Sequence, residues 1–416
     1  MRAAVAIGGT AALSACLDRA EQPAPIGDRS ELPTRQYAWV ESVPDDEHGN
    51  FVLPTHQVFL YLNYDGEEVP SSDDGERLET ALRSLERAVE WSNEGLLFSL
   101  GYSPAYFERF DEPLPDSVDL SAPRRLSEFE EPTLDEQDML LQMASDNAEV
   151  LLAAEEALLG ERDSVNMTEL ETDIADIVTV DDRRTGFIGN GLPAERVSDG
   201  VEGVPAEADV PDESPLFMGF KGGFDANQAS EDYIAIDEGP FENATTKHVS
   251  NIRQRLRDWY LEQDYEERVA EMFSATHAEK GLVEGAGLNL GGDNGVTEEM
   301  MTDLAEKANE YGRIGHAQKN ARFNRDEDGN VILHRRHVES TDDGYASLHF
   351  PSLQQSISQF ERVRVGMNGD DVRDSPRIRQ RVNNGILEYI FTLNRGNFLI
   401  PRRDQRAFPT PTGAVV

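Results

Sequence analysis

The first half of the chain contains two kinds of hydrophobic pattern, which predict strands and helices. Short apolar runs bounded by turn residues are typical of buried strands, and "QVFLYLNY" is the first of them. In "LETALRSLERAVEW", leucine recurs every three or four residues, which gives a helix one apolar face. We therefore predict strands at 57–64, 95–102 and 138–144, helices at 78–91 and 145–160, and a last strand after Gly186.

The second half repeats this plan more loosely. In the first half the order β-α-β-β-α-β is that of the split βαβ unit of ferredoxin-like domains. We predict an α+β fold in which two ferredoxin-like (split βαβ) halves pack as a dimeric α+β barrel, with a pocket in one half. For the second half we predict strands at 232–236, 344–350 and 396–401, and helices at 245–263, 297–312, 352–368 and 375–391.

The N-terminal residues have the proportions of a signal peptide. Arg2 is followed by an apolar run over residues 3–15, which is too short to span a bilayer. The run ends in "LSAC", which resembles a lipobox, the site where a lipoprotein is cleaved and its cysteine lipidated. A chance cysteine in a signal peptide is the alternative. We expect export, either into the medium or to the outer face of the cell membrane through a lipid anchor at Cys16.

Shifts in composition divide the chain into segments. A polar stretch with several prolines follows the signal peptide and is typical of a tether. A second stretch between the two halves is rich in Gly, Pro, Asp and Glu, which indicates a linker. The predicted segments are a signal peptide (1–16), a tether (17–50), the N-terminal half (51–190), a linker (191–215), the C-terminal half (216–405) and a tail (406–416).

Net charge narrows the classes of partner. The 416 residues carry a formal net charge of −42, from acidic residues spread along the whole length. Such a field repels nucleic acid and anionic membrane surfaces, so neither is expected as a partner. A dispersed acidic surface with few lysines is the composition of a halophilic protein, with an ordinary acidic protein as the alternative. One cysteine excludes an internal disulfide, and the phosphate-binding GxxxxGK[ST] and the G-x-S-x-G nucleophile elbow are both absent from the sequence.

Several stretches, in order, carry a family resemblance. They include "GLLFSLGYSPAYFERF" (95–110), "LFMGFKGGFDANQ" (216–228), "GRIGHAQKNARFNRDEDGNVILHRRHV" (312–338) and "GNFLIP" (396–401). Over roughly residues 50–405 the chain resembles the dye-decolourising (DyP-type) peroxidases, haem enzymes with two ferredoxin-like halves. The resemblance implies haem b as cofactor, hydrogen peroxide as substrate and a small organic electron donor. It also allows a homo-oligomer.

The resemblance assigns an iron ligand and a distal cation. His316 matches the proximal histidine, and neutral imidazole is a good iron ligand. His248 and His277 are the competing ligands. Arg335 matches the distal arginine, which polarises the peroxide as its O–O bond breaks. Arg336 takes that role if the alignment slips by one residue, and a haem propionate is the other partner this pair could bind.

The turn "GFKGGFDANQ" departs from the family pattern. The family has a GxxDG turn, and its aspartate falls on Gly222 here, with Gly219 and Phe220 in matching positions. That aspartate does general acid–base work. Either Asp225 supplies the carboxylate from three residues later, or the acid is lost. Gly222 and Gly223 let the backbone pass close to a flat ligand, or they form an ordinary turn.

The sequence thus predicts a haem-dependent peroxidase of the dye-decolourising type. Two alternatives remain open. One is a haem-binding or haem-transfer protein with little activity, and the other is a haem-free relic of the fold that serves a structural role. The candidate site residues are Arg335 and Asp225 for catalysis, His316 for iron, and Arg335, Arg336, Gly219, Phe220, Gly222 and Gly223 for the cofactor.

Overall fold

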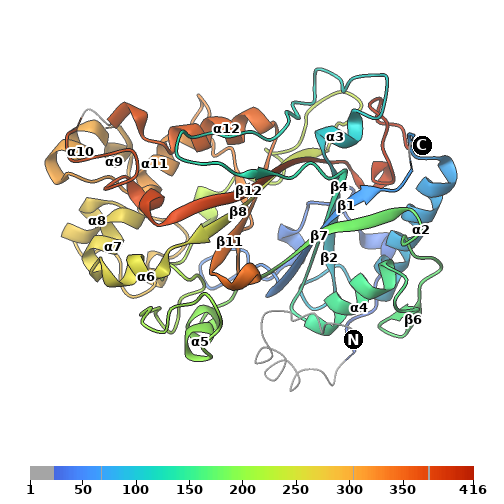
Figure 1. The fold of residues 1–416 in the computed structure, drawn as a ribbon, viewed down its shortest axis with the longest axis horizontal. Helices are drawn as coiled ribbons and strands as arrows, with labels where there is room; N and C mark the ends of the chain where they lie inside the picture. The colour runs from blue at the N-terminus through green and yellow to red at the C-terminus, as the bar shows by residue number, and fades with distance from the viewer. Residues whose placement is uncertain (1–22, 67, 303, 373–374) are drawn as a thin grey trace.

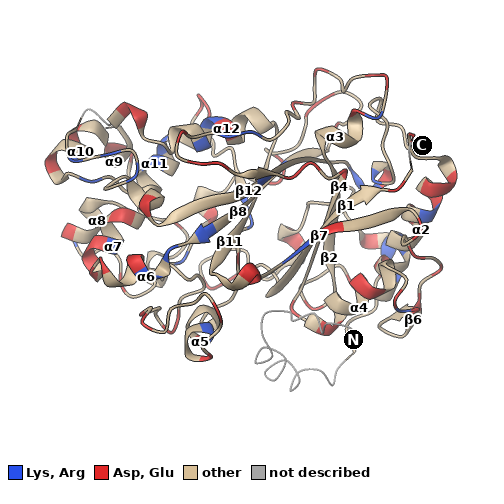
Figure 2. Ribbon diagram, in the orientation of Figure 1, with Lys and Arg blue, Asp and Glu red and all other residues tan. Residues whose placement is uncertain are grey.

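The computed structural model describes residues 23–66, 68–302, 304–372 and 375–416 (Figure 1). The predicted signal peptide and Cys16 lie outside the described residues. Within the described ranges, none of the helices combines the length and apolar character that a membrane crossing requires. Acidic residues are spread over the helices and loops at both ends of the molecule (Figure 2).

A mixed α+β fold surrounds a closed, barrel-like sheet. Eight strands follow one another in the order β10-β7-β1-β4-β2-β12-β8-β11, and β10 pairs with β11 to close the ring. Two short strands, β3 (Thr133–Leu134) and β9 (His334–Arg335), pair with β12 and β11. The ring strands are β1 (His56–Tyr64), β2 (Leu97–Tyr102), β4 (Met139–Ser145), β7 (Val178–Phe187), β8 (Thr245–Gln254), β10 (Val338–Ser340), β11 (Ser347–Gln354) and β12 (Ile390–Ile400).

In the N-terminal half, two helices cover the outer face of the sheet. The first, α2 (Ser72–Ala88), begins with a capping box in which Ser71 and Asp74 bond each other's backbone N–H groups. Asn147 caps the second, α4 (Ala148–Leu158). Their apolar faces pack against β1 in one continuous core, so this side of the sheet is filled by side chains. A short helix, α3 (Pro104–Phe107), follows β2.

In the C-terminal half, many short helices replace the two long ones. They gather beside β8, β11 and β12, at the opposite end of the molecule from α2 and α4 (Figure 1). The connection between β8 and β9 alone contains six of them, which leaves room between the sheet and its cover. These helices are α6 (Leu256–Leu261), α7 (Tyr265–Met272), α8 (Ala275–Glu279), α9 (Glu298–Thr302), α10 (Leu304–Tyr311) and α11 (His316–Phe323), and α12 (Ile357–Gly366) follows β11.

Several predicted elements are wrong in this half. Residues 245–263 form the strand β8 and then the short helix α6, because polar residues on both faces of β8 are buried and hide its alternation. Residues 232–236 form a turn rather than a strand. Residues 375–391 contain no α-helix, since Asn383 has a positive φ of 57° that ends any helical run.

Two smaller corrections concern the join between the halves. The last strand of the N-terminal half is β7, which ends at Phe187 instead of beginning after Gly186. Inside the predicted linker, residues 192–198 form a helix, α5 (Leu192–Ser198). The join is therefore partly structured.

Candidate functional site

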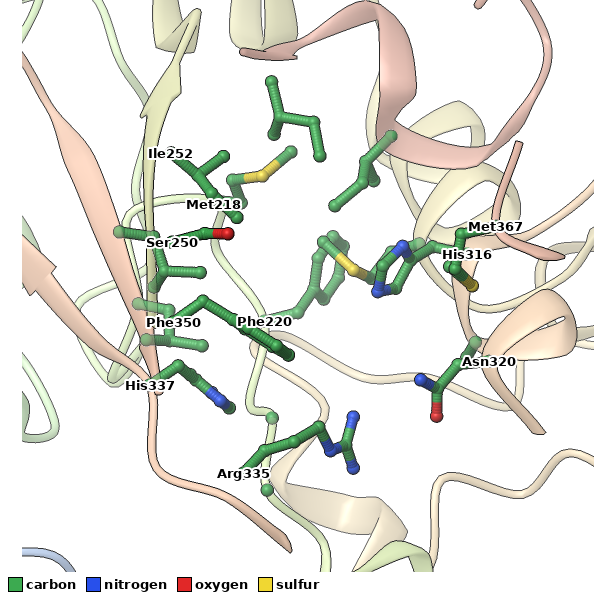
Figure 3. A pocket seen from close by; sticks show the side chains of 18 of the residues that line it. Met218, Phe220, Ser250, Ile252, His316, Asn320, Arg335, His337, Phe350 and Met367 are labelled. Carbon is green, nitrogen blue, oxygen red and sulfur yellow. The ribbon is translucent and has the colours of Figure 1, made fainter. Parts of the chain in front are cut away.

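A cavity separates the C-terminal strands from the helices that cover them. Its volume is about 220 Å³. Ile252 on β8 and Leu348 and Phe350 on β11 line it from the sheet, and α11 and α12 line it from the other side. Apolar side chains make up about half of the lining residues, and polar or charged ones come from the sheet, the turn and the helices (Figure 3). This combination is typical of a ligand site.

One strand segment supplies the polar wall. Successive side chains of an extended chain point to opposite faces, so Arg335, His337 and Glu339 share one face and all three line the cavity. The alternate residues of this segment face away from the cavity. His334 stacks on Phe51, and Val338 belongs to the core inside the barrel.

Arg335 carries an unpaired positive charge. Its Nε donates to Gln228 Oε1 at 3.2 Å, and its Nη2 donates to the carbonyl oxygen of Asn227 at 2.8 Å. No carboxylate among the described residues bonds this guanidinium. Burial lowers the pKa of Arg335 to about 10, so it still carries its charge at neutral pH. The cavity therefore contains a fixed cation that suits an anionic or polarisable ligand.

His316 lies on the opposite wall, at the first position of α11. The chain passes so close to α7 here that a Cβ on Gly315 would lie 1.8 Å from the carbonyl oxygen of Phe273. Burial, and then the charges of Lys319 and Arg335, lower the pKa of His316 to about 3. Within the described chain, no side chain or backbone group bonds its ring. His316 thus presents a neutral imidazole to the cavity, facing Arg335 and His337 (Figure 3).

The glycine-rich turn forms part of the wall between these groups. Phe220, Gly222 and Gly223 line the cavity, whereas Gly219 lies under Tyr260, outside the lining. Asp225 is exposed on a short 3₁₀ turn and also lies outside the lining. The structure therefore does not bring Asp225 to Arg335 or His316.

Three other sequence candidates are engaged elsewhere. Arg336 pairs with Glu231 at 2.6 Å and lies over the Trp39 ring, on the far face of the strand from the cavity. Both ring nitrogens of His248 are hydrogen-bonded, to Asn397 and Ser250 at 2.7 Å each. His277 bonds Ser274 Oγ and the carbonyl oxygen of Asn294. These bonds leave His316 as the histidine on the wall facing Arg335.

Sequence reasoning missed His337 and Glu339 as cavity residues. Burial raises the pKa of Glu339 to about 8, and its carboxyl oxygens accept bonds from Phe217 N and Gln254 Nε2. Counting every second residue from Arg335 would have found both side chains, since strand alternation puts them on one face.

A second pocket adjoins the cavity at the polar wall. It shares Lys221, Gly222, Arg335 and His337 with the cavity and is lined on its other side by residues near His48. Lys221 Nζ pairs with Asp46 Oδ2 at 2.7 Å there, and this ion pair joins the glycine-rich turn to the N-terminal segment. In the described parts of the chain, no group of three or more His, Cys, Asp or Glu side chains is arranged around a metal position.

The comparisons with known proteins agree on the fold. A model for a "Family of unknown function (DUF7405)" matches residues 54–402. No curated protein matches the chain. Among solved structures, it is similar to the encapsulated DyP-type peroxidase from Mycobacterium smegmatis (TM-score 0.56, 16% identity, covering 89% of this chain and 99% of that one).

Two further solved structures have a similar fold. One is a dye-decolorizing peroxidase from Bacteroides thetaiotaomicron (TM-score 0.51, 14% identity, covering 88% of this chain and 98% of that one). The other is a variant of DypB from Rhodococcus jostii RHA1 in complex with heme (TM-score 0.50, 14% identity, covering 90% of this chain and 99% of that one). At such identities, the similarity shows a shared fold.

Proposed function

We propose a function for this chain, which belongs to the DUF7405 family of unknown function. It is a haem-dependent peroxidase of the dye-decolourising type. The reaction is reduction of hydrogen peroxide, with one-electron oxidation of a small organic donor. One observation carries the proposal: the unbonded, neutral His316 and the unpaired Arg335 face one another across a largely apolar cavity (Figure 3). The shared fold with DyP-type peroxidases supports it.

The residues of the cavity fit a haem b group. A porphyrin needs apolar walls, which the β8 and β11 side chains supply. Its iron needs a neutral nitrogen ligand, and His316 holds one free of hydrogen bonds from the described residues. When bound, haem supplies the electrons that split the peroxide and recovers them from the donor one at a time. His316 would hold the iron from the α11 side.

Arg335 would act on the opposite side. Its guanidinium stabilises the negative charge that develops on peroxide oxygen as the O–O bond breaks. The bonds to Gln228 and Asn227 hold it in place before any ligand arrives, so little reorganisation is needed. The backbone of the turn at Phe220, Gly222 and Gly223 would border the ligand. Asp225 and Arg336 take no part, because one is exposed and the other is paired with Glu231.

Spectra of the purified protein test the proposal. We expect a Soret band after addition of haem, and its loss or a large shift in His316→Ala, with the exposed His48→Ala as control. Arg335→Ala should keep the band and lose peroxide-dependent dye oxidation by about 10²–10³-fold, as for removal of one charge-stabilising donor. A protein that takes up no haem, or that binds it equally well without His316, contradicts the proposal.

A second function has one observation in its favour. The family's acidic residue is absent at Gly222, and Asp225 lies outside the cavity lining. A haem-binding or haem-transfer protein with little activity would show the Soret band and its dependence on His316, but no dye oxidation. A protein without a Soret band would instead be a haem-free relic.

We further propose three properties that the sequence predicts and that the shared fold does not test. These are two ferredoxin-like halves at 51–190 and 216–405, export with a lipid anchor at Cys16, and adaptation to high salt. Mass spectrometry of the mature N-terminus tests the anchor, and an unmodified Cys16 would exclude it. Thermal unfolding in rising concentrations of KCl tests the salt adaptation, which predicts a higher Tm at high salt.

A further inference from the structure

A histidine lies where the acidic side chain of the turn is missing. A Cβ built on Gly222 would lie 2.9 Å from Nε2 and 3.2 Å from Cε1 of His337. An aspartate at position 222 would therefore require the imidazole to move from this position. In the present structure the ring occupies space beside position 222 that a side chain there would share.

We propose that His337 is the residue that moves the peroxide proton in this cavity, in place of a carboxylate at position 222. The inference rests on the proposed peroxidase function and names a catalytic residue for it. Its basis is the position of the ring beside Gly222, on the same strand face as Arg335 and across the cavity from His316 (Figure 3).

The ring of His337 is held in place but its nitrogens are free. It lies parallel to the Phe350 ring, with an interplanar angle of 8° and centroids 6.4 Å apart. No hydrogen bond reaches either nitrogen from the described residues. The ring lines both the cavity and the adjoining pocket, so a small ligand entering from either side meets Nε2. By contrast, Nδ1 of His334, on the opposite face of the strand, is bonded to the carbonyl oxygen of Ala229.

Burial, with the neighbouring Arg335 charge, keeps the ring neutral. Burial and then the Arg335 charge lower the pKa of His337 to about 4. Lys221, on the turn facing it, also lines the cavity, and His316 on α11 faces it across the space. An imidazole that is neutral at pH 7 is ready to accept a proton, which a base in this position must do first.

Glu339 is the rival for this role, since it is the next side chain on the same face. Its oxygens already accept bonds from Phe217 N at 2.8 Å and from Gln254 Nε2 at 3.1 Å. Those partners hold the carboxyl group in place. The nitrogens of His337 have no such partners, which favours the histidine.

The proton balance of the step is complete. Nε2 of His337 would take the proton from one peroxide oxygen and give it to the other, which leaves as water when the O–O bond breaks. The imidazole ends neutral, as it began. The remaining oxygen would leave as a second water once two molecules of organic donor have each supplied one electron and one proton, with haem as the group that relays the electrons.

Ligand binding tests this role without relying on turnover. Cyanide enters a haem site as the neutral acid and must give its proton to a base in the cavity. We expect His337→Gln to keep the Soret band and to slow both cyanide association and the spectral change with one equivalent of peroxide by about 100-fold or more. In the unsubstituted protein the cyanide rate should fall as the pH is lowered through about 4, where His337 becomes protonated, and H337Q should lack this inflection.

A rescue variant and a control sharpen the test. The double variant Gly222→Asp, His337→Gly returns a carboxylate to the turn and removes the ring that lies beside it. We expect it to recover the peroxide rate to within about tenfold of the unsubstituted protein. His334→Gln, on the opposite face of the strand, should change neither rate. Thermal unfolding of each variant shows whether the fold is kept.

The outcomes distinguish a failure of the His337 role from a failure of the proposed peroxidase function. An intact Soret band with unchanged cyanide and peroxide rates in H337Q overturns the role of His337 and leaves the peroxidase proposal standing. Failure of the unsubstituted protein to bind haem overturns both.

Discussion

In the N-terminal half of the barrel a strand face packs into a core, whereas in the C-terminal half a similar strand face borders the cavity. In the N-terminal half, Leu60 on β1 is 1% exposed and belongs to a core continuous with α2 and α4. In the C-terminal half, Leu348 on β11 borders the cavity and belongs to none of the apolar clusters of the described residues. Two long helices close one face completely, and short ones stand away from the other. In this molecule the sheet face under α2 and α4 is part of a core, and the face toward α11 and α12 borders the cavity.

Buried charge differs between the halves in the same way. Glu86 on α2 is paired with Arg403 and Arg406, and hydrogen bonds from Arg406 hold its pKa below the usual range against the effect of burial. Among the described residues no such cation is bonded to Glu339 or Glu271 in the C-terminal half, and burial raises the pKa of each to about 8. The N-terminal half compensates its buried charge, whereas the half with the cavity keeps groups that a ligand can perturb.

Truncation of the two leucines gives the largest expected contrast. Leu60→Ala leaves a void in a packed core and should lower the free energy of unfolding by about 2–5 kcal/mol. Leu348→Ala should cost about 1 kcal/mol, because its side chain already borders open space and loses few contacts. Urea unfolding measures both. Equal losses would mean that the cavity wall is packed like the core.

Replacing the same two leucines with a larger side chain tests whether each position has free space beside it. Leu60→Phe overpacks a filled core and should cost about 1–3 kcal/mol. Leu348→Phe has space to enter, so we expect a loss below about 1 kcal/mol, together with weaker retention of haem. The haem-to-protein ratio after gel filtration reports the second effect. A variant L348F that unfolds as easily as L60F would contradict the comparison.

The pH dependence of stability should differ in sign between the halves. Glu339 has a pKa raised from 4.5 to about 8, so the folded state holds a proton that the unfolded state loses. Its contribution is present below about 4.5 and is lost as the pH rises toward 8, by at most about 1.4 kcal/mol per pH unit. Glu86 has a lowered pKa, so its contribution is present above 4.5 and is lost in acid.

Urea unfolding between pH 5 and pH 8 checks this prediction. Glu339→Gln should reduce the decline over this range by about half, because Glu271 still contributes a similar slope. Glu86→Gln should leave the decline unchanged while lowering stability at every pH, because Arg406 loses its buried partner. A decline that is unaffected by E339Q would place the titrating proton elsewhere.

Sequence patterns predicted the filled half well and the half with the cavity poorly. The leucines of α2 lie on a sheet with one covered face, so their spacing directly reflects the packing. In β8, Lys247 is buried inside the barrel and Ser250 is buried at the cavity, so polar residues occur on both faces and imitate a helix. Hydrophobic alternation does not predict a strand correctly where buried polar residues, or a cavity, occur on a face that would otherwise be apolar core.

For the site, the sequence yielded single residues but not their arrangement. Resemblance drew attention to His316 and Arg335, and the structure brings both to one cavity. It also drew attention to Asp225, which lies outside. The pairing of Gly222 with His337 could not be predicted, because the two positions meet only through the folding of the turn against the strand.

The short strand β10 has two structural roles. It closes the ring by bonding β7 through Glu339 and Phe187, and the segment that leads into it carries the polar wall of the cavity. A chain leaving the ribosome therefore cannot assemble this wall until its first 340 residues have emerged and β10 has paired with β7. The N-terminal half has all of its own strands much earlier. Under the proposed function, uptake of haem would then come late in the maturation of the molecule.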